Sequence, residues 1–352
     1  MPNKERGSSF RDVARLAGVS LATVSRVASG RAQVREEIQI KVRAAAERLS
    51  VTLGAGTRSR VISFLLCNRE LLHPIHSRIF LGAEGFCVEH GWELAFQSFR
   101  YTVNTPAKNM QLPSILTRRD VVRAVIVGGS NTRDLIEALQ RHGLAVTIFG
   151  NNLIGDLPAG SCDVVYMDDV EGAREMTRYL IRLGHTHIRF VGNDQLPWVA
   201  RTASGYREVM EEHGLEACVS GLHSDERQAG YLTTRQLLSR REPMTAIFAS
   251  SDATAEGVYR ALRELNLDVP EDISVVGVND TEGAILHPAL TTIRSFPEEI
   301  GYHLAELAVS RLMTPHLPAR EISIPTQIVR RDSCRAPMLG GQGARQGGRQ
   351  PG

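Results

Sequence analysis

The chain has 352 residues, an ordinary apolar content of 42% and a net charge of only +2 at pH 7. No apolar run approaches the roughly 20 residues that a membrane span needs, and the N-terminus has no apolar core, so we expect neither a membrane segment nor a signal peptide. The five cysteines are scattered and form no CxxC pair, which argues against a disulfide framework or a zinc site. We therefore expect a soluble cytoplasmic protein that is long enough for more than one domain.

The near-neutral total hides an uneven distribution of charge. Residues 1–60 hold 12 Lys and Arg against 5 Asp and Glu, whereas residues 61–334 hold 26 against 34. The segment 335–352 is rich in Gly, Gln and Arg, has no acidic residue, and is predicted to be a disordered tail. A basic head on an acidic body suits a head that neutralises phosphates.

The first predicted element is a helix that begins at residue 10. Ser9 and Asp12 have the spacing of a capping box, which satisfies free N–H groups at a helix start. Val13, Leu16 and Ala17 fall on one face of this helix and are predicted to face inward. The helix should end at the following glycine, which can adopt the left-handed turn that side chains resist.

Two further helices complete the predicted head. The hydroxyl of Ser20 can cap a helix over 21–28, with Val24 and Val27 facing inward. Two short crossed helices cannot bury a core alone, and residues 36–49 supply a third helix, with apolar residues at steps of four, three and four. The pattern predicts a three-helix helix-turn-helix DNA-binding domain over residues 8–50, followed by a linker over 51–60.

After residue 60 short β-rich apolar runs alternate with amphipathic helical stretches. This alternation is typical of α/β domains with parallel sheets and right-handed crossovers. The number of strands is too large for one small sheet, so we expect two Rossmann-like lobes. The main predicted strands are 61–67, 93–99, 121–129, 145–152, 188–193, 246–251 and 273–280, and the main predicted helices are 79–91, 132–143, 171–185, 204–215 and 255–266.

Polar residues that follow the predicted strands are candidate ligand contacts. The carboxyl ends of the strands of two such lobes surround a shared cleft, where open α/β sheets bind small molecules. Carboxylates, an amide, an arginine and an indole suit a neutral polyhydroxylated ligand, because they bind hydroxyls and cover a C–H face. Each residue has a structural alternative, such as capping a helix. The predicted effector-binding residues are His76, Asp168, Trp198, Arg201, Asp252 and Asn279.

The motif DVARLAGVSLATVSRV (12–27) resembles the LacI/GalR family of bacterial transcription regulators. The resemblance continues through IRLGHTHIRFVGN (181–193), GYREVMEEHGL (205–215) and HPALTTIRSFPEEIG (287–301), and it covers residues 9–334. It implies a body like that of periplasmic binding proteins, over 61–334, whose chain crosses repeatedly between two lobes. We expect these lobes at about 61–164 plus 292–323 and 165–291 plus 324–334.

Two departures from the family pattern bear on function. The family commonly has an effector-binding arginine where this chain has Thr202, with Arg201 one residue earlier. The family also places a short hinge helix with a minor-groove leucine in the linker, where this chain has Gly54 and Gly56. Each glycine costs a helix about 1 kcal/mol. Either Leu53 serves in a shifted register, or this protein bends DNA less than its relatives.

The sequence therefore predicts a dimeric transcription regulator, most simply a repressor, controlled by a sugar-like effector. A narrower alternative is a purine or other corepressor; a sugar-binding transport protein would lack the head and need a signal peptide. No catalytic constellation is present, and we expect no enzyme activity, cofactor or metal site. His185 and His187 in the motif GHTHI could be metal ligands, but the resemblance to the family implies that they are structural turn residues. Base edges of operator DNA should meet Leu21, Ala22 and Arg26, and phosphates Ser20, Thr23 and Ser25.

Overall fold

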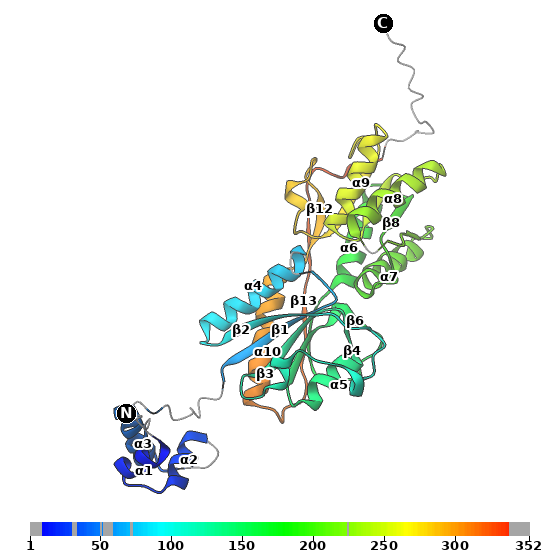
Figure 1. Ribbon diagram of the computed structural model, residues 1–352. Coiled ribbons are helices and arrows are strands. Elements are labelled where there is room, and N and C mark those ends of the chain that lie inside the picture. Colours follow the sequence, from blue (N-terminus) through cyan, green and yellow to red (C-terminus); the bar gives the residue numbers. More distant parts are fainter. Residues whose placement is uncertain are drawn as a thin grey trace, which may run out of the picture.

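The computed structural model describes residues 9–29, 34–49, 51, 59–70, 73–223 and 225–337. Figure 1 shows a small helical head at the N-terminal end of the chain and two larger α/β lobes. The predicted linker (51–60) and tail (335–352) lie mostly outside the described residues, and the predicted hinge residues Leu53, Gly54 and Gly56 lie wholly outside them. Within the described residues, no helix is both long and apolar enough to cross a membrane.

The head consists of α1 (Phe10–Ala17), α2 (Leu21–Ser29) and α3 (Glu36–Arg48). The predicted capping box is confirmed, because Asp12 accepts hydrogen bonds from both the backbone N–H and the hydroxyl of Ser9. Gly18 ends α1 in the left-handed conformation at φ 67°. The predicted inner valines of α1 and α2 pack in one cluster with residues of α3. Leu16 does not join them and is 47% exposed, since it lies on the outer edge of the short α1.

Lobe 1 is built on a six-stranded, fully parallel sheet. The order of the strands across the sheet is β13 (Glu321–Ile324), β7 (Asp163–Met167), β5 (Ala145–Phe149), β3 (Val122–Gly129), β1 (Val61–Cys67) and β2 (Glu93–Phe99). Two short parallel strands, β4 (Asn131–Thr132) and β6 (Leu153–Ile154), pair separately.

Lobe 2 repeats this architecture with one antiparallel strand, β14, at its edge. The order is β14 (Gln327–Val329), β12 (Thr291–Arg294), β11 (Ser274–Asn279), β10 (Ala246–Ala249), β8 (Ile188–Val191) and β9 (Cys218–Ser220).

Helices cover both faces of each sheet, as parallel sheets require. In lobe 1 these are α4 (Pro74–Glu89), α5 (Arg133–Arg141) and α10 (Pro297–Met313); in lobe 2 they are α6 (Asp169–Arg182), α7 (Pro197–Glu212), α8 (Glu226–Ser239) and α9 (Asp252–Glu264). Short 3₁₀ turns are η1 (Ala107–Asn109), η2 (Ser114–Thr117), η3 (Gly150–Asn152) and η4 (Gly283–Ile285).

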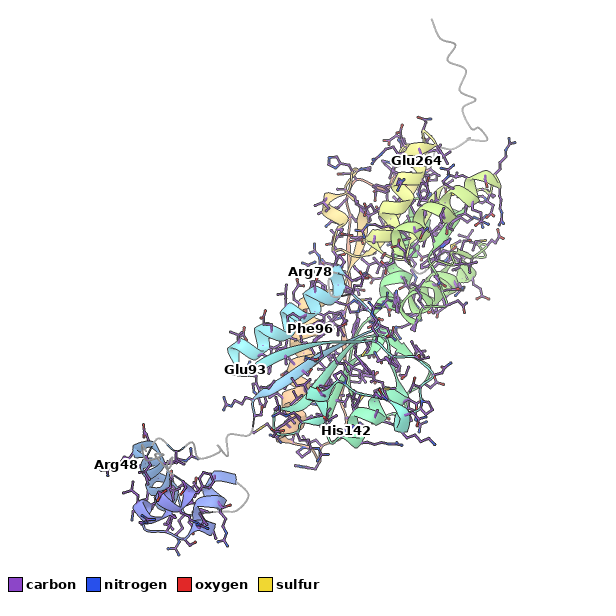
Figure 2. All side chains as sticks on the ribbon, viewed as in Figure 1. Arg48, Arg78, Glu93, Phe96, His142 and Glu264 are labelled. Atoms are coloured by element: carbon purple, nitrogen blue, oxygen red, sulfur yellow. The ribbon has the colours of Figure 1, made fainter. Side chains whose placement is uncertain are left out.

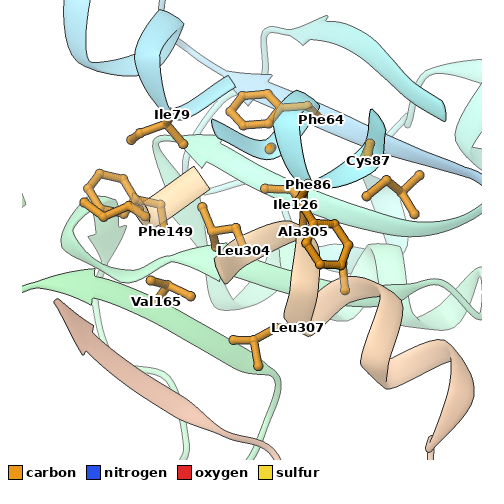
Figure 3. Close-up of a cluster of buried hydrophobic side chains, with 14 of the residues drawn as sticks. Phe64, Ile79, Phe86, Cys87, Ile126, Phe149, Val165, Leu304, Ala305 and Leu307 are labelled. Carbon is orange, nitrogen blue, oxygen red and sulfur yellow. The ribbon is translucent and has the colours of Figure 1, made fainter. Parts of the chain in front are cut away.

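The core under α4 and α10 illustrates how lobe 1 is held together (Figure 3). Phe64 of β1, Ile79 of α4 and Leu304 of α10 are fully buried in one cluster. The two helices can approach closely because Gly82 has no side chain. A Cβ at this position would collide with the main-chain oxygen of Glu298. Residues that are more than 200 positions apart in the chain thus close one face of the sheet.

The chain crosses between the lobes three times. It leaves lobe 1 after β7, returns after β12, and crosses again between β13 and β14. Two crossings lie slightly later than we expected from the sequence: all of β7 (Asp163–Met167) belongs to the lobe 1 sheet, and β12 (Thr291–Arg294) belongs to the lobe 2 sheet. Each crossing follows the end of a strand, so the whole strand stays with its sheet.

Several helices begin earlier than predicted, and the two largest shifts place candidate site residues inside helices. The sequence analysis placed helices at 79–91 and 204–215, but α4 starts at Pro74 and α7 at Pro197. Proline suits the first helical position because its missing N–H has no acceptor there. His76, Trp198 and Arg201 therefore lie in helices rather than in loops after strands.

Candidate functional site

The first candidate site is the outer surface of α2 in the head. Ser20, Leu21, Ala22, Ser25 and Arg26 are all exposed, and Leu21 keeps 45% of its surface. The hydroxyl of Ser20 caps the helix, because it accepts a hydrogen bond from the backbone N–H of residue 23 at 3.1 Å. The predicted cap is thus confirmed.

Thr23 differs from its neighbours on α2. It is half-buried, and its hydroxyl lies 2.8 Å from that of Ser20. The other helices of the head carry exposed basic side chains, among them Arg48 at the end of α3, which Figure 2 labels. The exposed part of α2 thus combines small polar, apolar and basic side chains.

The second candidate site is a cavity between the two lobes. Its walls come from both lobes, at the carboxyl ends of strands and the first turns of the helices that follow them. Lobe 1 contributes Arg69, His73, Ile75, His76, Phe149, Asn151, Asn152 and Met167, and lobe 2 contributes Trp198, Thr202, Glu226, Ser250, Ser251, Val278 and Asn279. This is the position at which open α/β sheets bind ligands.

The lobe 1 wall of the cavity is cationic and rich in nitrogen donors. His76 is only 3% exposed, and its Nε2 lies 3.1 Å from the amide nitrogen of Asn152. Burial is the main cause that lowers the pKa of His76 to about 3, so its ring is neutral at physiological pH. The guanidinium of Arg69 extends across the cavity and lies 3.8 Å from the centre of the Trp198 ring on lobe 2.

The lobe 2 wall carries the cavity's carboxylate. Glu226, the first residue of α8, lies 3.4 Å from Nε2 of His73 and accepts a hydrogen bond of 2.7 Å from the hydroxyl of Ser251. Burial by itself would raise the pKa of Glu226, but the contacts with His73 and Ser251 and the charge of Arg69 lower it to about 2. Glu226 is therefore ionised. Two contacts connect the lobes across the cavity: Glu226 with His73, and Trp198 with Arg69.

Several polar atoms on the cavity walls lack a partner within the protein. Among the described residues, the buried atoms without a hydrogen bond include Arg69 Nε, His73 Nδ1, His76 Nδ1 and Asn279 Oδ1, and all four belong to residues that line the cavity. A buried polar atom left unpaired costs about 1–3 kcal/mol. These atoms come from both lobes, and the same cavity also has apolar lining residues. A bound polar ligand could form hydrogen bonds with such atoms.

Three of the predicted effector-binding residues line this cavity, namely His76, Trp198 and Asn279. The other three do not. Asp252 is 1% exposed and accepts hydrogen bonds from the backbone N–H groups of Glu282 and Gly283 and from the hydroxyl of Thr292. It joins η4 to β12 and is not among the residues that line the cavity, so its contact with the effector stays a prediction.

Asp168 and Arg201 also find partners inside the protein. Asp168 caps α6 by accepting a hydrogen bond from the backbone N–H of Glu171 at 3.2 Å. Arg201 forms two contacts of 2.8 Å with the buried carboxylate of Asp169, to which Asn151 also donates at 2.8 Å. Thr202, at the family's usual arginine position, lines the cavity instead.

Sequence reasoning missed two charged residues of the cavity. Arg69 follows the first predicted strand by two residues, so the rule applied to the other strand ends would have found it. Glu226 follows β9, a three-residue strand with too little pattern to predict. The predicted strand 145–152 hid Asn151 and Asn152, because β5 ends at Phe149 and the two asparagines lie in η3.

The histidines of the GHTHI motif lie away from the cavity lining. Nδ1 of His185 lies 2.9 Å from the hydroxyl of Thr245, and its Nε2 lies 2.9 Å from the backbone oxygen of Arg335. Both ring nitrogens therefore serve contacts within lobe 2. No group of three potential metal-ligating side chains occurs among the residues that the structure describes.

Comparison with known proteins assigns the family. The model of bacterial regulatory proteins of the lacI family matches residues 9–51, and that of the periplasmic binding protein-like domain matches residues 177–334. The ribose operon repressor of Escherichia coli (strain K12) is 30% identical over 340 residues, which cover 93% of this chain and 100% of the relative. The chain belongs to the LacI family. It is accordingly a DNA-binding transcription regulator and not an enzyme.

Two solved structures extend the likeness to the three-dimensional fold. The complex of the transcriptional regulator CelR with cellobiose has a TM-score of 0.69 at 25% identity, covering 93% of this chain and all of that one. The lac repressor dimer bound to operator and the anti-inducer ONPF has a TM-score of 0.69 at 22% identity, covering 94% and 100%. The head and the two-lobed body therefore occur together in known structures, as the sequence predicted. A regulator of this family binds DNA and so works in the bacterial cytoplasm.

Proposed function

We propose that this LacI-family regulator is a dimeric repressor whose affinity for its operator is set by a small polyhydroxylated effector, a sugar or sugar derivative. The observation that carries the proposal is the group of buried, unpartnered polar atoms on residues of both lobes that line one cavity. Hydroxyl groups can both donate to and accept from such atoms, and the apolar lining residues suit the C–H faces of a sugar ring.

The relatives support the same ligand class. One is named as the repressor of a ribose operon, and one structural neighbour is a complex with cellobiose. A ligand that touches both walls favours the closed arrangement of the lobes. It changes operator affinity only to the extent that it prefers one arrangement over another.

The head supplies the DNA contacts in this proposal. In a dimer, two heads related by a two-fold axis match a pseudopalindromic operator. Leu21 and Ala22 offer apolar contact to base edges, and Arg26 can grip a guanine bidentately. Ser20, Thr23 and Ser25 hold phosphates, with the half-buried Thr23 contributing least.

Ligand binding by the full chain tests the proposal. The full chain is titrated with D-ribose, cellobiose and other sugars, and its thermal unfolding is followed at each concentration. A parallel series uses the purines hypoxanthine and guanine. A ligand that binds only the folded protein raises its melting temperature by mass action. We expect a sugar to give this shift and to change binding of an operator selected from random duplex DNA. A shift with a purine alone would replace the sugar with a corepressor.

Two variants separate the cavity from the rest of lobe 2. Trp198→Ala removes a cavity wall and should abolish the ligand-induced shift, measured against the variant's own ligand-free melting temperature. Leu222→Ala alters a side chain that is 85% exposed and outside the cavity lining, and should keep the shift. A sugar-induced shift that survives in Trp198→Ala would place the effector elsewhere.

A further inference from the structure

Arg69 is an unusual member of the cavity wall. It comes from lobe 1, yet the contact that its guanidinium makes is with the ring of Trp198 on lobe 2, at 3.8 Å. A ring face attracts a cation but offers no lone pair to its N–H groups. In agreement with this, Nε of Arg69 is buried and has no hydrogen-bond partner among the described residues.

The charge of Arg69 is also not neutralised by direct contact. Among the described residues, no carboxylate oxygen lies within 4.0 Å of its guanidinium nitrogens. The cavity's carboxylate, Glu226, is already held by His73 and by the hydroxyl of Ser251. Burial lowers the pKa of Arg69 and the charge of Glu226 opposes this, but a guanidinium remains protonated in proteins.

A second nitrogen donor belongs to His76, which lines the same cavity. The amide nitrogen of Asn152 can only donate, so Nε2 of the neutral His76 ring accepts from it and the ring proton sits on Nδ1. That N–H group is buried without a partner. The charge of Arg69 contributes to the lowered pKa of His76, which means that the two groups lie within electrostatic reach.

We propose that the effector carries an anionic oxygen group, a carboxylate or a phosphate, which Arg69 binds while the rest of the sugar occupies the cavity beside Trp198. Planar guanidinium groups bind both anions through paired N–H donors, and such charge-assisted bonds are about twice as strong as neutral ones. The His76 Nδ1–H supplies a neutral donor in the same cavity. This inference rests on the proposed function, since it specifies the sugar class that the cavity selects.

The alternative role for Arg69 is a latch. In that case its contact with Trp198, together with the contact between His73 and Glu226, only holds the lobes closed. A latch has no preference for charge in the ligand, whereas an anion-binding arginine discriminates between a sugar and its charged derivative. The two roles therefore differ in a measurable way.

The test compares ligands that differ only in the anionic group. The full chain is titrated with D-glucose, D-glucuronate and D-glucose 6-phosphate, and with D-ribose and D-ribose 5-phosphate, at constant ionic strength. We expect a carboxylate or phosphate derivative to bind at least about ten-fold more tightly than its neutral parent. The carboxylate and phosphate arms show which anion the site takes.

Variants of Arg69 assign the effect to this residue. Arg69→Gln should lose about ten-fold or more in affinity for the charged ligand and stay within about three-fold for the neutral parent. Arg69→Lys should recover part of the loss, because it restores charge without the planar fork. Arg133→Gln, at a 61% exposed arginine of lobe 1 paired with Glu137, is the matched control and should bind like wild type.

The outcomes separate this inference from the proposed function. If neutral sugars bind as tightly as their charged derivatives, or if Arg69→Gln leaves the charged ligand unaffected, Arg69 is a latch and the inference fails while the sugar effector stands. If no sugar of either kind binds and a purine does, both proposals fail together.

Discussion

The six residues predicted to contact DNA lie within seven consecutive positions, and five of them are exposed on or just before one helix. The fifteen residues that line the interlobe cavity are spread from Arg69 to Asn279 and come from both lobes. The predicted DNA contacts thus form one continuous surface, whereas the cavity depends on long-range packing. Substitutions in the head should therefore change binding with little effect on stability. Substitutions of buried polar residues next to the cavity lining should mainly lower the free energy of unfolding.

The largest expected effect is at Asp252, which is buried at the start of α9 and lies outside the cavity lining. Asp252→Ala leaves two backbone N–H groups and the hydroxyl of Thr292 without their buried acceptor. Each unpaired donor costs about 1–3 kcal/mol, so we expect a loss of roughly 3 kcal/mol or more in the free energy of unfolding. Denaturant titration of the full chain measures this. A loss below about 1 kcal/mol would mean that the loop finds other acceptors.

The isosteric variant Asp252→Asn gives a control with a defined pH dependence. Burial is the main cause that raises the pKa of Asp252 to about 6 from an ordinary value near 3.8. A raised pKa stabilises the fold below about pH 4, and this contribution, about 3 kcal/mol in all, is lost as the pH rises through 6. The advantage of wild type over Asp252→Asn should therefore be larger at pH 4 than at pH 7. An equal difference at both pH values would contradict this.

The next effect belongs to the head. Arg26→Ala should weaken operator binding by about 1–3 kcal/mol and relax the preference at one base pair, because Arg26 is the long-chain donor of α2. The melting temperature should stay unchanged, since the residue is exposed. Binding is measured at matched salt, with Arg133→Ala on lobe 1 as control. Unaltered affinity together with unaltered base preference would remove Arg26 from the contact surface.

The smallest effect is at the capping box of α1. Ser9→Ala removes the hydroxyl that binds Asp12 at 2.7 Å. Loss of a cap of this kind should speed hydrogen exchange of the α1 amides about five-fold, because the first turn opens more often. Ser239→Ala, at the exposed end of α8, should leave these amides unchanged. If the two variants exchange alike, the capping box contributes nothing to the head.

The sequence by itself determined the head and the general plan of the body. Helical periodicity, the Ser9–Asp12 spacing and Gly18 define the head through contacts between near neighbours, which a linear pattern records. Alternation of strands and helices likewise predicted parallel sheets, and the rule for strand ends placed the cleft and three of its residues. Helix starts at Pro74 and Pro197 were misplaced, since apolar periodicity begins later than the helix does.

Only the tertiary structure decided how each polar side chain is used. Asp252, Arg201 and Glu226 are charged residues whose roles the sequence does not distinguish, because their partners come from segments far away in the chain. Asp252 meets Thr292, Arg201 meets Asp169, and Glu226 meets His73 across the lobes. A sequence pattern cannot record such pairs, because the partner and the burial that determine a charged group's role exist only once both lobes have folded and met.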